Sequence, residues 1–126
     1  QEGGLDGTVF LPGYVTPPEQ VLEKADVLLK LGIDNAPWGR DVIESLSHGV
    51  PVIALGTYDR FVRNGFNGFL FAQYDSAAIA DALVKMRNDP DLRSRMRNEC
   101  LKLAGEIFAP ERAATAIDHI YREVLG

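Results

Sequence analysis

Cysteine is almost absent from this chain, with Cys100 alone among 126 residues. A single cysteine excludes an internal disulfide and a multi-cysteine metal site, and it fits a reducing compartment. No apolar run approaches the roughly 20 residues of a membrane span, no signal peptide is visible, and no internal repeat is present. An ordinary globular protein remains, in agreement with a composition that is 46% hydrophobic and 25% charged.

Positive charge is also in short supply, because the formal net charge is -5. A general nucleic-acid-binding protein needs a clustered basic surface, so we expect no nucleic-acid partner. One group of basic residues is interrupted by acids: Arg87, Arg93, Arg95, Arg97 and Lys102. A solvated helical face is the favoured interpretation of this group, with a membrane-surface or partner contact as the alternative.

The length predicts one domain that folds without a metal or a disulfide, since a chain of this size buries about two-thirds of its unfolded surface. Because the first residue is Gln1, we expect the chain to be an excised part of a larger protein. Cys100 recurs at helical spacing with four apolar residues, namely Leu92, Met96, Leu103 and Ile107. It is therefore interpreted as a core residue and not as a nucleophile.

Apolar runs that suit buried strands alternate with helical patterns, which predicts a Rossmann-like α/β fold with a parallel sheet, helices on both faces and a helical C-terminal part. The expected strands cover residues 8–11, 26–31, 51–54 and 69–71. The expected helices cover 16–25, 39–48, a short segment through 61–62, and three segments that start at 75, 90 and 110. Local signals mark two helix ends: Thr16 with Glu19 as a capping box, and His48 with Gly49 as a C-cap.

The segment from Gly39 to Ala54 is the most informative part of the sequence. A helix that begins at Gly39 presents free backbone N–H groups to an anion, and glycine lets a ligand approach the backbone. Glu44 lies about one and a third turns further on, where a carboxylate can reach a ribose diol. The alternative is an ordinary helix opened by glycine with a solvated glutamate. Flanking strands favour a site, because ligands of open α/β sheets bind beyond the carboxyl ends of the strands.

The order of several segments resembles the C-terminal, donor-binding domain of group 1 retaining glycosyltransferases of the GT-B fold. The resemblance extends from about Val9 to Tyr121. It is carried by a strand ending in Phe-Leu-x-Gly at 10–13, Lys-Ala-Asp-Val at 24–27, Gly-x-x-x-x-Glu-Ser at 39–45, Gly-x-Pro-Val-Ile-Ala at 49–54 and Asn-Gly-x-x-Gly-Phe-Leu at 64–70.

The resemblance implies roles for particular residues. Glu44 matches the second glutamate of the family's Glu-x7-Glu motif, which holds the ribose of a nucleotide sugar. Gly39, Arg40 and Asp41 match the positions that meet the diphosphate, and the segment Gly13-Tyr14-Val15 would face the base.

The sequence departs from the family pattern at two positions. Ala36 stands where the first motif glutamate usually contacts the donor sugar, and Arg60 stands where a glutamate is common. Asn35 or Asp34 could replace the missing carboxylate by hydrogen bonding to sugar hydroxyls. Trp38 could wall the pocket or serve only in packing.

The resemblance implies transfer of a sugar, with retention, from a nucleotide-diphosphate sugar to an acceptor. The alternatives are a non-catalytic binding module of the same fold and a related nucleotide-sugar epimerase. By the same resemblance, relatives carry a basic loop upstream of the Val9 strand that neutralises the diphosphate, and an N-terminal domain that binds the acceptor; we expect this chain to supply neither. We therefore expect no catalytic residue in this chain, no turnover by the chain alone, and a monomeric fragment. No metal or other cofactor is implied, and the expected location is the cytoplasm, with the inner face of a membrane as an alternative.

Overall fold

Three short parallel strands form the centre of the computed structural model, which describes residues 4–5, 7–108 and 110–126. The strands are β1 (Leu28–Lys30), β2 (Val52–Leu55) and β3 (Gly68–Phe71), and they pair in the order β1-β2-β3. The predicted parallel sheet is confirmed, although β1 is shorter than the predicted segment 26–31.

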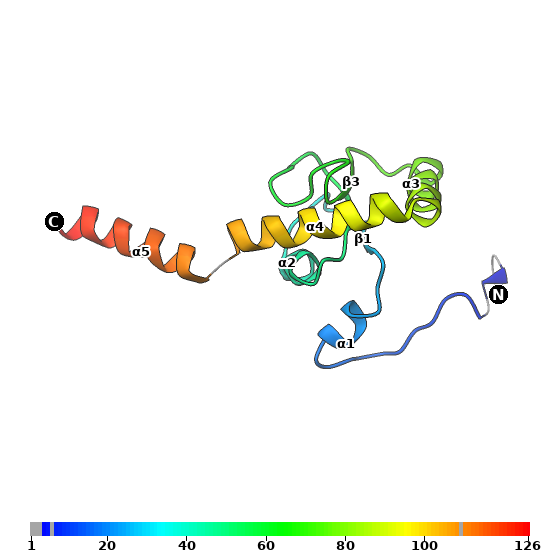
Figure 1. The fold of residues 1–126 in the computed structure, drawn as a ribbon, viewed down its shortest axis with the longest axis horizontal. Coiled ribbons are helices and arrows are strands. Elements are labelled where there is room, and N and C mark those ends of the chain that lie inside the picture. The colour runs from blue at the N-terminus through cyan, green and yellow to red at the C-terminus, as the bar shows by residue number, and fades with distance from the viewer. Residues whose placement is uncertain (1–3, 6, 109) are drawn as a thin grey trace.

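The helices are α1 (Glu19–Leu22), α2 (Arg40–Ser47), α3 (Ser76–Asn88), α4 (Pro90–Ile107) and α5 (Pro110–Leu125). Asp75 and Asp89 cap α3 and α4, because their carboxylates accept hydrogen bonds from backbone N–H groups of the first turn. Pro90 occupies the first turn of α4, where its missing N–H costs no helical bond. In Figure 1, α4 runs past the sheet from α3 towards α2.

The core has two parts because successive residues of the fully buried strand β2 point to opposite faces of the sheet. Val52 and Ala54 pack in a cluster with α2 and the C-terminal half of α4, whereas Ile53 and Leu55 pack with α3 and the N-terminal half of α4. Cys100 is fully buried in the first cluster, so its predicted place in the core is confirmed. Helices therefore cover both faces, as predicted.

The predicted strand at residues 8–11 is not formed. Phe10 and Leu11 are 83% and 87% exposed, and no strand pairs with this segment in the described residues. A strand needs a hydrogen-bonded neighbour. Among the described residues β1 pairs only with β2, so residues 8–11 have no strand beside them. Apolar composition alone was the basis of the prediction, and it does not supply that neighbour.

Two predicted local structures are also wrong. Helix α1 begins at Glu19 and not at residue 16, and no side chain caps it, so Thr16 and Glu19 form no capping box. The Oε2 atom of Glu19 is buried without a hydrogen-bond partner among the described residues. The segment through Phe61 and Val62 is not helical, because the buried Asn67 side chain binds its backbone: Nδ2 donates to the Phe61 carbonyl and Oδ1 accepts from Arg63 N–H, both at 2.7 Å.

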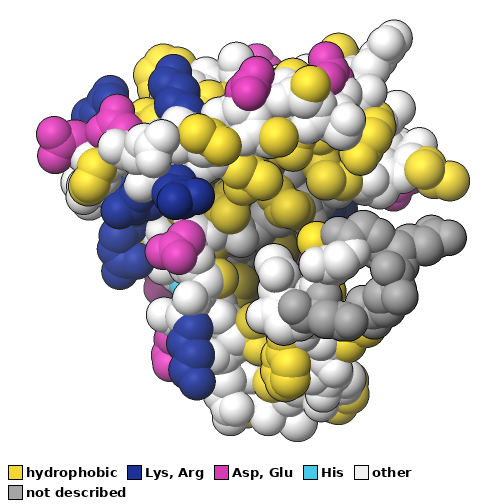
Figure 2. Space-filling model, turned by 90° about the vertical axis from the view of Figure 1, so that its right-hand side faces the viewer, with side chains coloured by type: hydrophobic (Ala, Val, Ile, Leu, Met, Phe, Trp, Pro, Cys, Tyr) yellow, Lys and Arg dark blue, Asp and Glu magenta, His cyan; other side chains and the backbone are white. Residues whose placement is uncertain are grey.

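Apolar surface remains exposed on α5 and on the face that carries α3. Helix α5 projects away from the sheet in Figure 1, and Ile117, Ile120 and Tyr121 on it are 54–62% exposed. Figure 2 shows further hydrophobic side chains gathered across the middle of the face that carries α3. None of the helices in the described ranges combines the length and hydropathy that a membrane span requires.

Candidate functional site

The start of α2 is set by Gly39, which adopts φ 126° and ψ 175° as the N-cap residue. A Cβ atom at this position would lie 3.0 Å from the Asp41 Oδ1 atom, so both the backbone angle and the available space favour glycine. Gly39 has no side chain to cap the first turn. The helix therefore begins where the sequence predicts. Because glycine has no side chain, the N-cap residue does not cover the first backbone N–H groups of the helix.

The opposite side of α2 fixes its position. Val42 and Leu46 are fully buried in the core cluster, and the Ser45 hydroxyl donates a hydrogen bond of 2.9 Å to the Val50 carbonyl. At the other end, His48 is the C-cap, and its Nδ1 lies 2.8 Å from the Glu44 carbonyl oxygen. The predicted capping role of His48 is thus confirmed, and α2 is held firmly by its core side.

Arg40 and Glu44 are brought together on α2. The Arg40 Nε atom donates to Glu44 Oε1 at 2.6 Å, and the two side chains are 87% and 23% exposed. The hydrogen bond to Glu44, and then its negative charge, raise the pKa of the Arg40 guanidinium, with smaller contributions from Glu19 and Tyr14. Glu44 is therefore a partly covered carboxylate that already accepts a charge-assisted hydrogen bond from Arg40. We call this N-terminal end of α2, from Gly39 to Glu44, the α2 mouth.

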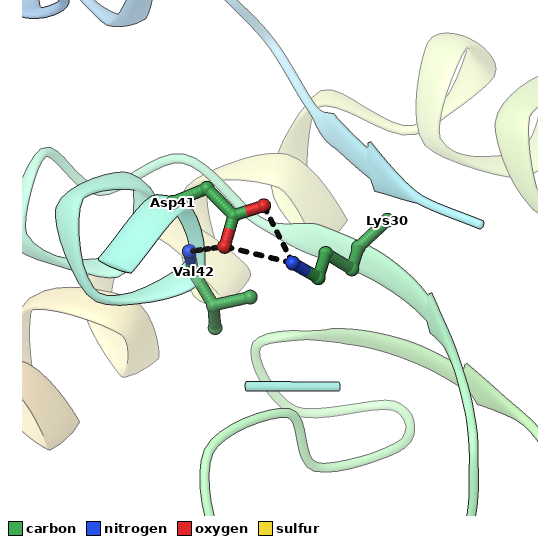
Figure 3. Close-up of polar contacts among 3 residues, drawn as sticks. All are labelled: Lys30, Asp41 and Val42. Atoms are coloured by element: carbon green, nitrogen blue, oxygen red, sulfur yellow. Dashed lines mark hydrogen bonds and ion pairs between the residues drawn. The ribbon is translucent and has the colours of Figure 1, made fainter. Parts of the chain in front are cut away.

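Asp41 forms a second pair at the same mouth, with Lys30 at the end of β1 (Figure 3). The Lys30 Nζ atom lies 2.8 Å from Oδ2 and 3.1 Å from Oδ1, and Asp41 Oδ1 also accepts from Val42 N–H at 2.9 Å. The four charged side chains therefore form two ion pairs, each of one cation and one carboxylate: Arg40 with Glu44, and Lys30 with Asp41.

Lys30 was not among the residues selected from the sequence. The available signal is a lone basic residue within the apolar segment Val27–Leu31. Its partner is 11 residues away, so the contact depends on how α2 packs on the sheet. Helical spacing rules predict only pairs such as Arg40 and Glu44.

The loop between β1 and α2 packs against the end of β2. Pro37 is fully buried, and a Cβ atom at Gly56 would lie 2.6 Å from the Asn35 carbonyl oxygen. Asn35 itself has φ 50°, in the left-handed region that asparagine tolerates. The loop that carries Asn35 and Ala36 is thus held next to the carboxyl end of β2.

Trp38 is 46% exposed, and its ring lies edge-on to Tyr58 with centroids 5.5 Å apart. Tyr58 in turn contacts Phe61 edge-on at 5.9 Å. Trp38 therefore has a packing partner as well as an open surface beside Gly39. Tyr14, in the segment predicted to face a base, is 92% exposed.

Two hollows of about 440 and 470 Å³ lie apart from the α2 mouth, as does a third of about 480 Å³ beside α3. The first is lined by residues from 63–67 and from α4, and the second by residues from 56–72, including Asp59 and Arg63. The described residues contain no group of three or more potential metal ligands. The α2 mouth is therefore an open surface whose chemistry comes from backbone N–H groups, two cations and two carboxylates.

Comparison with known proteins identifies the family. The family described as "Glycosyl transferases group 1" matches residues 1–102. Among curated proteins, a poly(glycerol-phosphate) alpha-glucosyltransferase of Bacillus subtilis is 27% identical over 84% of this chain and 16% of its own length. A phosphatidyl-myo-inositol mannosyltransferase of Mycobacterium leprae is 34% identical over 75% of this chain and 26% of its own length. The chain thus spans about a quarter or less of these two relatives.

Solved structures show the same fold. The crystal structure of Anabaena Alr3699/HepE in complex with UDP aligns with a TM-score of 0.86 and 21% identity, covering 95% of this chain and 34% of that chain. Sucrose-phosphate synthase from Thermosynechococcus elongatus aligns with a TM-score of 0.72 and 22% identity, over 86% of this chain and 27% of that chain. The chain belongs to the group 1 glycosyltransferases and has the architecture of the C-terminal domain of their GT-B fold.

Proposed function

We propose that this chain binds the nucleotide-diphosphate part of a sugar donor within a retaining glycosyltransferase. The observation that carries the proposal is the α2 mouth, where Gly39 opens the helix and the Glu44 carboxylate lies beside Arg40. Support also comes from Alr3699/HepE, whose structures were solved in complex with UDP and with UDP-glucose.

In this proposal the diphosphate binds at the N-terminus of α2. The backbone N–H groups and the helix dipole attract the anion there, and Arg40 supplies a mobile positive charge because its side chain is 87% exposed. Glu44 accepts hydrogen bonds from the ribose hydroxyls, and the segment 13–15 contacts the base. Asn35 and Trp38 face the donor sugar, in the absence of a glutamate at Ala36.

The reaction that follows is glycosyl transfer. The bond between the anomeric carbon and the diphosphate oxygen breaks, a bond from the anomeric carbon to the acceptor oxygen forms, and the leaving diphosphate takes up the proton of the acceptor hydroxyl. The chain contributes by positioning the donor and by stabilising the charge that develops on the leaving diphosphate. The specific sugar and acceptor depend on groups outside the α2 mouth.

A second domain of the same polypeptide completes the enzyme in this proposal. The α2 mouth is open, the chain spans 34% of the Alr3699/HepE chain, and α5 keeps an exposed apolar face. Closure of a cleft between two domains would exclude water and bring the acceptor to the donor. The chain alone should therefore bind donor weakly and catalyse no transfer, and a nucleotide-sugar donor favours a cytoplasmic location for the enzyme.

One observation favours a different function, a binding module without catalytic activity. Ala36 has no carboxylate for the donor sugar, and its loop is packed against the end of β2. Such a module should bind a nucleoside diphosphate as well as it binds the corresponding nucleotide sugar. A catalytic donor site should distinguish between them.

The test is a titration of the chain with nucleoside diphosphates and their sugars. The chain has one tryptophan, and Trp38 beside the mouth gives a fluorescence signal that calorimetry can verify. We expect dissociation constants in the high micromolar to millimolar range, because the closing domain that would pre-organise the site is absent. No binding by any member of the panel would contradict the proposal.

Glu44→Gln makes the test specific for the ribose. The substitution keeps the shape but weakens charge-assisted hydrogen bonds, so nucleoside diphosphate affinity should fall about tenfold. A nucleotide that lacks both ribose hydroxyls should bind the variant and the original protein equally. Glu123→Gln is the matched control, because Glu123 is exposed on α5. Equal losses with both nucleotides would remove the ribose role.

A further inference from the structure

Lys30 occupies an unusual place for a lysine. It is the last residue of β1, it pairs in register with the fully buried Ala54 of β2, and its side chain is only 25% exposed. Leu28, two residues earlier and on the same side of the strand, packs against the α2 cluster. An apolar residue would suit this position for packing alone, so the cation needs an explanation of its own.

The ammonium group lies directly in front of α2. A Cβ atom placed on Gly39 would lie 3.5 Å from Lys30 Nζ, so the ammonium stands next to the N-cap position itself. Two contacts to Asp41 hold it there (Figure 3). An ammonium has three hydrogens, and no further acceptor for the third is present among the described residues.

The negative charge of Asp41 explains why the position of Lys30 affects the binding of an anion. A carboxylate in the first turn of a helix is stabilised by the helix dipole, but it repels a second anion at the same mouth. Lys30 neutralises that carboxylate from the sheet side, while Arg40 pairs with Glu44. Without Lys30, an incoming diphosphate would face an unpaired negative charge at the helix N-terminus.

We propose that Lys30 is a diphosphate-binding residue of the donor site, positioned by Asp41 and donating its remaining N–H to a phosphate oxygen. The inference rests on the proposed function of the α2 mouth. It adds a positive charge from β1 to that of Arg40, in the role that a basic loop before the Val9 strand has in relatives. The competing explanation is a purely structural ion pair that ties β1 to α2.

The experiment compares UDP with uridine on the chain, by calorimetry and by NMR titration. Lys30→Met removes the charge and keeps the aliphatic length. We expect UDP to bind about tenfold more weakly, as for the loss of a hydrogen bond to a charged group, and uridine to bind as before. Lys85→Met is the matched control on α3, where Lys85 is exposed, and should change neither affinity. A thermal melt should show a shift of only a few degrees for Lys30→Met, because partly exposed ion pairs stabilise little.

Asp41→Asn is the second variant: it keeps the charge of Lys30 and one acceptor oxygen beside the ammonium group, but removes the negative charge of the carboxylate. It removes the competing anion, so UDP should bind about threefold more tightly, with uridine unchanged. Two results with Lys30→Met would overturn the inference. One is an equal loss of affinity for UDP and uridine, and the other is an unchanged affinity for UDP while UDP still shifts the α2 amides. In the latter case the proposed function stands. Failure of every nucleoside diphosphate in the panel to affect α2 in the original protein would overturn both.

Discussion

The two sides of helix α2 differ in what their residues contact. On the core side Val42 and Leu46 are fully buried among apolar neighbours, whereas Arg40 and Asp41 at the mouth have side chains that are 87% and 48% exposed and contact other charged groups. Burial of apolar side chains stabilises the fold, while exposed ion pairs contribute little to stability. The core side therefore fixes the helix, and the mouth is available to bind a ligand.

The largest expected effect comes from the core side of the sheet. Gly68 begins β3, and a Cβ atom there would lie 1.8 Å from the Val52 carbonyl oxygen. Gly68→Ala cannot be accommodated without moving β2 and should lower the free energy of unfolding by more than about 4 kcal/mol, which chemical denaturation will measure. Gly105→Ala is the control, because a Cβ atom on α4 at Gly105 meets no atom within 4 Å and alanine favours a helix. A stable Gly68→Ala protein would contradict this arrangement of β2 and β3.

Leu46→Ala is the next largest change and acts on α2 itself. Leu46 is fully buried, so its truncation leaves a cavity between α2, β2 and α4. Unfolding free energy should fall by about 2–5 kcal/mol in urea denaturation. A loss below about 1 kcal/mol would show that α2 is not fixed by its core side.

Cys100 tests the same core by chemistry. Burial raises the pKa of its thiol from 9.0 to about 12. Folding thus favours the protonated thiol, so this contribution to stability is full below the unfolded pKa of about 9 and is lost as the pH rises towards 12. A thiol reagent at mildly alkaline pH should react at least about a hundredfold more slowly with the native protein than with the denatured protein. Equal rates would place Cys100 outside the core.

Arg40→Ala should have the smallest effect on stability. Its side chain is exposed and pairs one turn along with Glu44, so the melting temperature should barely change, as for pairs worth about 0.3–0.5 kcal/mol. Nucleoside diphosphate affinity should fall instead, because a positive charge at the mouth is lost. A loss of stability as large as that of Leu46→Ala would remove the distinction between the two sides.

Most of the fold follows from local sequence signals. The strand β2 is an uninterrupted apolar run, Gly39 and Gly49 bound α2, and the aspartates before α3 and α4 are efficient caps. The three failures have a common reason. A strand at 8–11 depends on a partner strand, a cap at Thr16 depends on where the helix starts, and a helix at 61–62 loses its backbone groups to Asn67.

The candidate site also has a part that local sequence signals predict and a part that they do not. The motif locates Gly39 and Glu44, and helical spacing is enough to pair Glu44 with Arg40. The pair of Lys30 and Asp41 joins β1 to α2. Only the packing of α2 on the sheet brings these two residues together. Charged groups that meet through tertiary packing are invisible to a periodic pattern.

The central claim is that the mouth of α2 binds a nucleoside diphosphate, and an NMR titration of the chain with UDP tests it most directly. We expect the amides of Gly39, Arg40 and Asp41 to shift first and furthest, with Glu44 affected and α3 unchanged. The two hollows near residues 63–67 provide the alternative location. Shifts confined to those residues and α4, with no change in α2, would contradict the account.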